Sequence, residues 1–114
     1  MHTFRDAVRS KDFVVTAQLP LDPASTARDV RASVDALHGI VDALQISDNH
    51  DARPHLAPLA AASLVLQSGM DALVHMSCRD RNRIALQSDL MGAAALGVTS
   101  LILTRGEKLP ASLK

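Results

Sequence analysis

Aromatic residues are almost missing from this chain of 114 residues. Two phenylalanines make up the whole aromatic share of 2%, and there is neither tryptophan nor tyrosine. Platforms that stack nucleic-acid bases or sugars therefore have almost no side chains to be built from, and the core must be aliphatic. The formal net charge is zero, with 12 basic and 12 acidic residues. No overall field then attracts nucleic acid or anionic lipid.

Cysteine and long hydrophobic runs are also scarce. Cys78 is the only cysteine, which excludes an internal disulfide framework and fits a reducing compartment. No apolar run reaches the roughly eighteen residues of a membrane span, and no signal-peptide pattern opens the chain. Hydrophobic residues still make up 47% of the chain, enough for a core. These features predict a cytoplasmic domain that binds neither membrane nor nucleic acid.

A repeated strand–helix unit organises the chain. Strand-like runs begin near residues 13, 41, 71 and 99, a period of about 29 residues, and helical patterns fill the intervals. Short right-handed crossovers turn such a repeat into a parallel sheet. Four units amount to half of a (β/α)8 barrel of roughly 250 residues. An open, doubly wound domain has the same order of elements, so this order leaves both architectures open.

The densest polar stretch lies where the third expected strand, residues 71–76, passes into the fourth helix. Residues 75–83 read His-Met-Ser-Cys-Arg-Asp-Arg-Asn-Arg, and parallel α/β proteins bind ligands at such places. Arg79, Arg81 and Arg83 at a helix amino terminus suit an anion, with Asp80 as the expected N-cap. An arginine–aspartate network that ties neighbouring loops together is the alternative.

Four segments, taken together and in order, carry a resemblance to a known enzyme family. They are Phe-Val-Val-Thr-Ala-Gln at 13–18, Val-Asp-Ala-Leu-Gln-Ile-Ser-Asp-Asn at 41–49, Cys-Arg-Asp-Arg-Asn-Arg-Ile-Ala-Leu-Gln-Ser at 78–88 and Leu-Thr-Arg-Gly-Glu at 103–107. The chain thereby resembles the methylenetetrahydrofolate reductases, which are flavin-dependent (β/α)8-barrel enzymes. The resemblance covers the first half of the barrel, so residues 1–114 are expected to form one partial domain, an α/β half barrel of four parallel strands.

The resemblance implies an activity and a set of site residues. The family reduces 5,10-methylenetetrahydrofolate to 5-methyltetrahydrofolate in one-carbon metabolism and methionine biosynthesis, and hydride passes from NAD(P)H through bound FAD. Gln18 stands where the family places the acid that protonates the folate, and Glu107 where it places an aspartate near the flavin. Asp48 and Asn49 are predicted, with Gln18, to bind the folate substrate. The implied FAD-binding positions are Ser47, His75, Arg105 and Gly106.

Two features keep a second hypothesis open. An amide does not titrate, so Gln18 should not act as a general acid, although it can still hydrogen-bond a pterin. Four units also leave the first and fourth strands as open edges, which we expect a second copy or a partner chain to cover. The alternatives to an active reductase are thus a non-catalytic partner subunit and an inactive remnant.

Some of these residues also have plain structural interpretations. His75 is alternatively a buried histidine bonded to the backbone, and Glu107 a solvated charge. The other histidines show no ligand spacing on one helical face, so no metal site is predicted.

Overall fold

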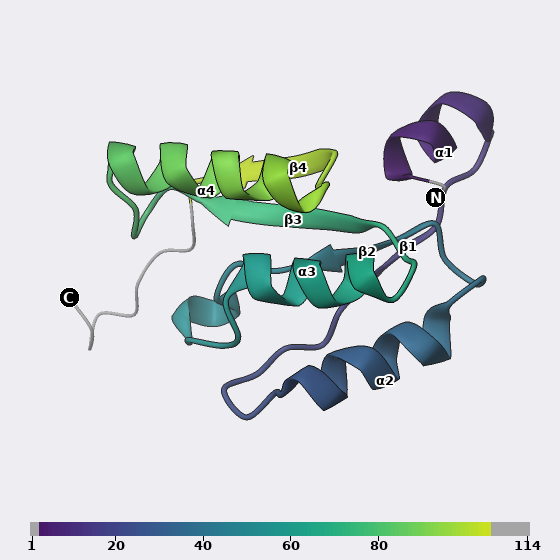
Figure 1. The fold of residues 1–114 in the computed structure, drawn as a ribbon, viewed down its shortest axis with the longest axis horizontal. Helices are drawn as coiled ribbons and strands as arrows, with labels where there is room; N and C mark the ends of the chain where they lie inside the picture. Colours follow the sequence, from purple (N-terminus) through teal and green to yellow (C-terminus); the bar gives the residue numbers. More distant parts are fainter. Residues whose placement is uncertain (1–2, 106–114) are drawn as a thin grey trace.

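The computed structural model describes residues 3–105, in which helices and strands alternate as expected (Figure 1). The helices are α1 (Phe4–Ser10), α2 (Ala27–Leu37), α3 (Pro58–Gln67) and α4 (Arg83–Leu96), with a single turn of 3-10 helix, η1 (His50–Ala52). The strands are β1 (Thr16–Gln18), β2 (Ala43–Ile46), β3 (Ala72–Ser77) and β4 (Ser100–Thr104). No helix within residues 3–105 is long and apolar enough to cross a membrane.

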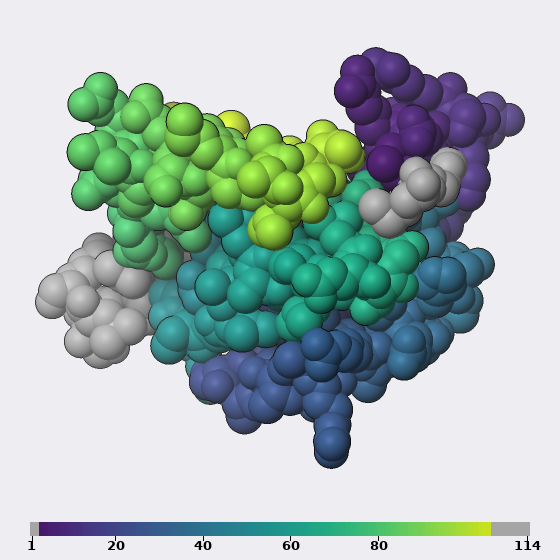
Figure 2. All heavy atoms as spheres, viewed as in Figure 1, coloured from purple at the N-terminus to yellow at the C-terminus, as the bar shows by residue number. Residues whose placement is uncertain are grey.

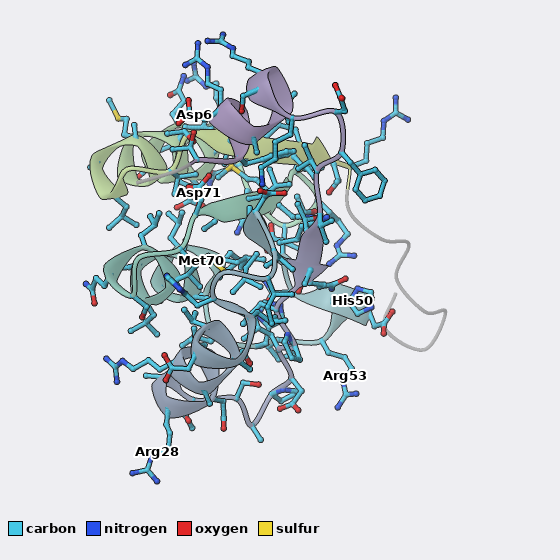
Figure 3. All side chains as sticks on the ribbon, turned by 90° about the vertical axis from the view of Figure 1, so that its right-hand side faces the viewer. Asp6, Arg28, His50, Arg53, Met70 and Asp71 are labelled. Atoms are coloured by element: carbon cyan, nitrogen blue, oxygen red, sulfur yellow. The ribbon has the colours of Figure 1, made fainter. Side chains whose placement is uncertain are left out.

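The four strands form one parallel sheet in the order β1-β2-β3-β4. Helices α2, α3 and α4 pack on the same face of this sheet (Figure 3). On the molecular surface α3 lies between α2 and α4 (Figure 2). A doubly wound sheet reverses its strand order and places helices on both faces. Sequential order with helices on one face is instead the winding of a barrel segment. The expected four-stranded parallel βα repeat is confirmed.

The core lies between the sheet and the three helices and is aliphatic. Its strand residues include Leu44, Ile46 and Val74, which are fully buried. Because successive strand residues point to opposite faces, the residues between them point away from the helices. Gln45 and His75 are therefore on the other face. The fully buried or nearly fully buried side chains of the helices are Val30 and Val34 of α2, Ala61, Ala62 and Val65 of α3, and Ala93 of α4.

Local sequence explains most of the helix ends. Thr26 caps α2 by accepting the Asp29 backbone N–H, while the Asp29 carboxylate accepts the N–H of Thr26 at 2.8 Å. Gly97 ends α4 with φ of +93°, a conformation that favours glycine. The N-cap of α4 is Asn82, whose side chain accepts the Ala85 N–H at 2.8 Å. The prediction that Asp80 caps this helix was wrong.

The first strand is shorter than its apolar run. A strand was expected to begin near residue 13, but β1 comprises only Thr16–Gln18. The reason is Asp42, whose carboxylate accepts the N–H of Val15 at 2.9 Å and so takes the place of a strand partner. Phe13, 80% exposed, lies outside the sheet.

Candidate functional site

A hollow of about 220 Å³ opens at the carboxyl ends of β2, β3 and β4. We call it the carboxyl-edge hollow. All of its lining residues are polar or charged, and they lie in β3 and β4 or in the segments that follow β2 and β3. They are Ser47, Asp48, Asn49, His50, His75, Ser77, Arg79 and Thr104.

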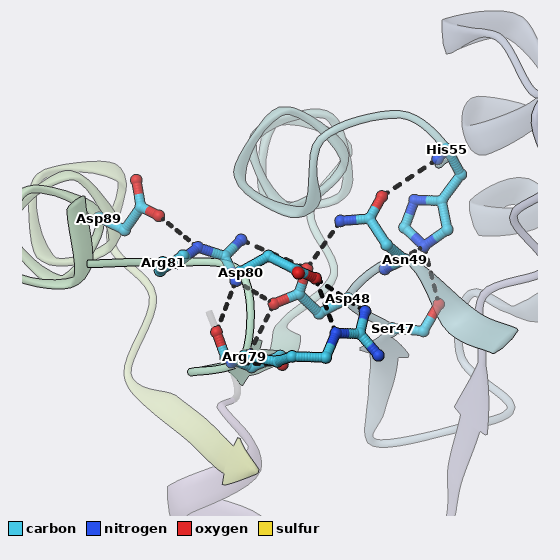
Figure 4. Close-up of polar contacts among 9 residues, drawn as sticks. Ser47, Asp48, Asn49, His55, Arg79, Asp80, Arg81 and Asp89 are labelled. Atoms are coloured by element: carbon cyan, nitrogen blue, oxygen red, sulfur yellow. Dashed lines mark hydrogen bonds and ion pairs between the residues drawn. The ribbon is translucent and has the colours of Figure 1, made fainter. Parts of the chain in front are cut away.

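Asp48 is the most heavily bonded residue of this hollow (Figure 4). Its side chain is only 4% exposed. The carboxylate accepts the backbone N–H of Ser77 at 2.6 Å and the side-chain amide of Asn49 at 2.9 Å. Both terminal nitrogens of Arg81 also donate to it. Asp48 thus links the end of β2 to the end of β3.

These bonds set the protonation of the pair. Burial by itself would raise the pKa of Asp48, but the hydrogen bonds from Arg81 and from the Ser77 N–H outweigh burial, and the pKa lies below its usual 3.8. The same hydrogen bond to Asp48 raises the pKa of Arg81. Arg81 Nε also donates to Asp89 of α4 at 2.8 Å. One guanidinium therefore bridges two carboxylates.

Two of the three arginines of the polar stretch, Arg79 and Arg81, form a network with carboxylates rather than an open anion site, and Arg83 is exposed. Arg79 donates through Nε to Asp80 at 2.9 Å, and Arg81 is shared between Asp48 and Asp89. Within residues 3–105, the ion pairs of Arg79 and Arg81 bring two guanidinium groups against three carboxylates. An incoming phosphate or carboxylate would therefore compete with these carboxylates for the guanidinium groups. The structure agrees with the alternative interpretation, an arginine–aspartate network that ties neighbouring loops together.

His55 clamps the loop that follows β2. Its Nδ1 lies 2.7 Å from the carbonyl oxygen of Leu56, which can only accept, so Nδ1 carries the proton. Its Nε2 accepts the backbone N–H of Asn49 at 2.9 Å and lies 3.2 Å from Ser47 Oγ. The Asn49 N–H already occupies the lone pair of Nε2, so His55 does not take a proton from the Ser47 hydroxyl. Ser47 is therefore not an activated nucleophile. The clamp holds a loop in which Ala52 has φ of +56°, a strained value for alanine.

A second hydrogen-bond chain crosses the face of the sheet opposite α2, α3 and α4. Gln45 donates from Nε2 to Thr16 Oγ1 at 2.8 Å, and its Oε1 lies 2.9 Å from His75 Nε2. The chain joins β1, β2 and β3 side by side and ends at the carboxyl-edge hollow, which His75 lines. Burial lowers the pKa of His75 below its usual 6.5, although Asp48 acts in the opposite direction.

The structure brings some of the predicted site residues together. Ser47, His75, Asp48 and Asn49 all line the carboxyl-edge hollow. Gln18 is exposed and pairs in register with Gln45 on the same sheet, but it does not line this hollow.

Three other predicted site residues, Arg105, Gly106 and Glu107, follow β4 in the sequence. Arg105 is exposed, follows β4 and does not line the hollow. Gly106 and Glu107 lie outside the described residues, so the predicted roles of these two residues stay predictions.

The sequence interpretation missed three residues that organise the site. Gln45 and Thr16 were treated only as strand residues, and His55 was dismissed because it lacked metal-ligand spacing. A polar glutamine between two buried aliphatic residues, Leu44 and Ile46, was the available signal for Gln45. No pattern in the neighbouring sequence indicated a role for His55, because its hydrogen-bond partners depend on the conformation of the loop that follows β2.

The comparisons with known proteins do not add a family. The chain matches none of the protein-family models searched, and no curated protein matches it.

Proposed function

We propose that the carboxyl-edge hollow is the flavin-facing part of a methylenetetrahydrofolate reductase-like site, in a partial barrel domain. The observation that carries this proposal is the meeting of Ser47 and His75, expected along FAD, with Asp48 and Asn49, expected to bind the folate. These residues come from two strands, and a parallel sheet places both sets at its carboxyl edge, where barrel enzymes carry out their chemistry. The site would act in cytoplasmic one-carbon metabolism.

The lining of the hollow fits part of FAD. Its neutral hydrogen-bonding side chains include Thr104 and Ser77, which suit the polar edge of a flavin ring. The Ser77 hydroxyl accepts the Arg79 backbone N–H at 3.2 Å and keeps its own proton to donate. At about 220 Å³ the hollow is smaller than the roughly 300–1,000 Å³ of sites that enclose a whole ligand. The described residues would therefore hold one edge of the cofactor. When bound, FAD would relay hydride from NAD(P)H to the folate.

Gln18 supports a role in binding more than one in proton transfer. It is exposed on β1, next to Gln45 in register, where an amide can hydrogen-bond a pterin. Because an amide neither gives nor takes a proton near neutral pH, the folate would have to receive its proton from elsewhere.

The open edges of the sheet favour a second candidate, a non-catalytic subunit that assembles with a partner. Within residues 3–105, β1 and β4 each pair on one side only. Beside the β4 edge, Leu103 is 65% exposed, and on α4 Ile84 and Met91 are 71% and 74% exposed. Apolar groups at an unpaired edge promote association. A strand that extends the sheet at this edge would cover them, and in this candidate a second copy or a partner chain supplies it.

FAD binding by the purified chain tests the proposal, with flavin fluorescence and mass in solution recorded together. Binding that falls at least tenfold in His75→Ala and in Ser47→Ala would support it. His38→Ala is the matched control, because His38 is exposed at the amino end of the sheet, and it should bind FAD like the unmodified chain.

The two candidates give different results in this experiment. If FAD binds to an assembly, reductase activity should be absent or weak and should rise in Gln18→Glu. If the chain binds FAD but neither the unmodified chain nor Gln18→Glu has reductase activity, the result favours the partner subunit. No FAD binding in any assembly state contradicts the flavin proposal.

A further inference from the structure

The bonding of Gln45 decides which hydrogen bond His75 can offer to a ligand. Gln45 spends its Nε2–H on Thr16 Oγ1, so it turns Oε1 toward the imidazole. A carbonyl oxygen only accepts, and His75 Nε2 must therefore donate across the 2.9 Å contact. In a neutral imidazole with Nε2 protonated, Nδ1 is an acceptor.

We propose that Thr16 and Gln45 are positioning residues that hold His75 in its Nε2–H tautomer, so that the carboxyl-edge hollow selects neutral ligand groups that donate an N–H or O–H bond. The inference concerns the same hollow as the proposed function, and it names the chemistry of the ligand group that His75 meets.

The surroundings of His75 support a neutral ring. The imidazole lies on the face of β3 opposite α2, α3 and α4, and the charged residues around the hollow are Asp48, Arg79 and, when protonated, His50. Asp48 is fully engaged with Arg81, Ser77 and Asn49, so it does not bond the imidazole in place of Gln45. In the nearby ion-pair network, three carboxylates face two guanidinium groups among the described residues. A bare Nδ1 lone pair beside that network disfavours an anionic ligand group.

The chain itself provides an internal reference for the tautomer. His55 must carry its proton on Nδ1, because that atom bonds the Leu56 carbonyl at 2.7 Å. His75 and His55 should therefore be opposite tautomers in the same molecule. Nitrogen-15 NMR of the imidazole rings distinguishes protonated from bare ring nitrogens, and one spectrum at about pH 8, where imidazoles are neutral, compares both histidines.

The experiment uses the ligand-free full chain, with His75→Gln to assign the His75 signals. We expect His75 to show a protonated Nε2 and a bare Nδ1, and His55 to show the reverse. In Gln45→Leu, both His75 nitrogens should move toward intermediate shifts, whereas Gln45→Glu, which keeps an acceptor, should restore a protonated Nε2. A protonated Nδ1 on His75 in the unmodified chain, or no change in Gln45→Leu, would overturn the positioning role.

Paired titrations test the ligand class. Uracil, a neutral ring with N–H donors, should shift the His75 Nδ1 signal, and inorganic phosphate should not. A shift with phosphate, or none with uracil, would overturn the assignment of the ligand. The tautomer is measured without flavin, so failure of FAD binding leaves that result standing, and a wrong tautomer leaves the FAD experiment interpretable.

Discussion

The carboxylate of Asp71 accepts the backbone N–H of Phe4 at 2.7 Å, which joins the start of β3 to the first turn of α1 across 67 positions in the chain. Asp71 is 1% exposed and lies beneath α1 (Figure 3). Its other oxygen, Oδ1, is buried and has no hydrogen-bond partner among residues 3–105. Buried carboxylate oxygens are rarely left without a partner. The hydrogen bond therefore holds α1 to the sheet, while Oδ1 of the same carboxylate stays buried without a partner.

Removing this carboxylate should release α1. We expect Asp71→Ala to lower the free energy of unfolding by about 1.5–3 kcal/mol, the range for a hydrogen bond to a charged group. Asp71→Asn should cost less, because it keeps an acceptor for Phe4 and removes a buried charge. Urea unfolding measures both, and amide exchange at Ala7 should accelerate in Asp71→Ala. Asp35→Ala, at an exposed position of α2, is the control and should leave both measurements unchanged.

Arg81 should matter far more to stability than its neighbour Arg83. Arg81→Ala leaves the nearly buried Asp48 without its main counter-charge, which should cost about 3 kcal/mol. Arg81→Lys should recover only part of this loss, because one ammonium does not span Asp48 and Asp89 as the guanidinium does. The exposed Arg83, changed to Ala, should stay within about 0.5 kcal/mol of the unmodified chain. Equal losses for Arg81→Ala and Arg83→Ala, in thermal or urea unfolding, would argue against the network.

Stability should fall as the solution becomes acidic, in two steps. The pKa of His75 is lowered in the folded chain, so below its usual 6.5 the unfolded chain binds the proton more readily, and stability declines. The pKa of Asp48 is also lowered, so its contribution is present above 3.8 and is lost as the pH falls through the folded-state value. Urea unfolding at a series of pH values measures both steps.

A variant separates the two steps. His75→Gln should flatten the upper one and leave the lower one in place. The titratable groups that line the hollow with His75 are Asp48, Arg79 and His50. His50→Gln is therefore the matched control and should retain the upper step. Stability that rises between about pH 7 and pH 5.5 would contradict the direction of the His75 shift.

Two glycines of the α4 region should respond to alanine in opposite directions. Gly97 has φ of +93° with nothing near the position of a Cβ atom, so Gly97→Ala should cost about 1 kcal/mol in backbone strain alone. Gly92 lies inside α4, and a Cβ there would meet Leu59 Cδ1 at an ordinary 3.5 Å. Gly92→Ala should therefore gain up to about 1 kcal/mol from helix propensity. Thermal unfolding of both variants tests the pair, and a gain for Gly97→Ala would contradict the assigned C-cap.

The helix ends and the spacing of the strands could be predicted because they depend on neighbours in the sequence. Thr26 and Asp29 form a capping box within one turn, and Gly97 ends α4 through its own backbone freedom. Asp80 was the wrong choice for a cap because Asn82, two residues later, is equally suited to that role. The shortened β1 was not predictable, because the Asp42 side chain that replaces its partner comes from a different loop.

By itself the sequence determined the alternation of strands and helices, the aliphatic core and the edge of the sheet where polar groups gather, since each follows from local periodicity and from the rules of parallel sheets. Only the tertiary structure decided between a barrel segment and a doubly wound sheet, because strand order and the helix-covered face are relations between distant segments. The tertiary structure also decided that Arg81 bonds Asp48 and that Gln45 orients His75. These pairs are 33 and 30 residues apart in the sequence. Hydrogen bonds over such separations depend on strand register and side-chain direction, which no short window of sequence contains.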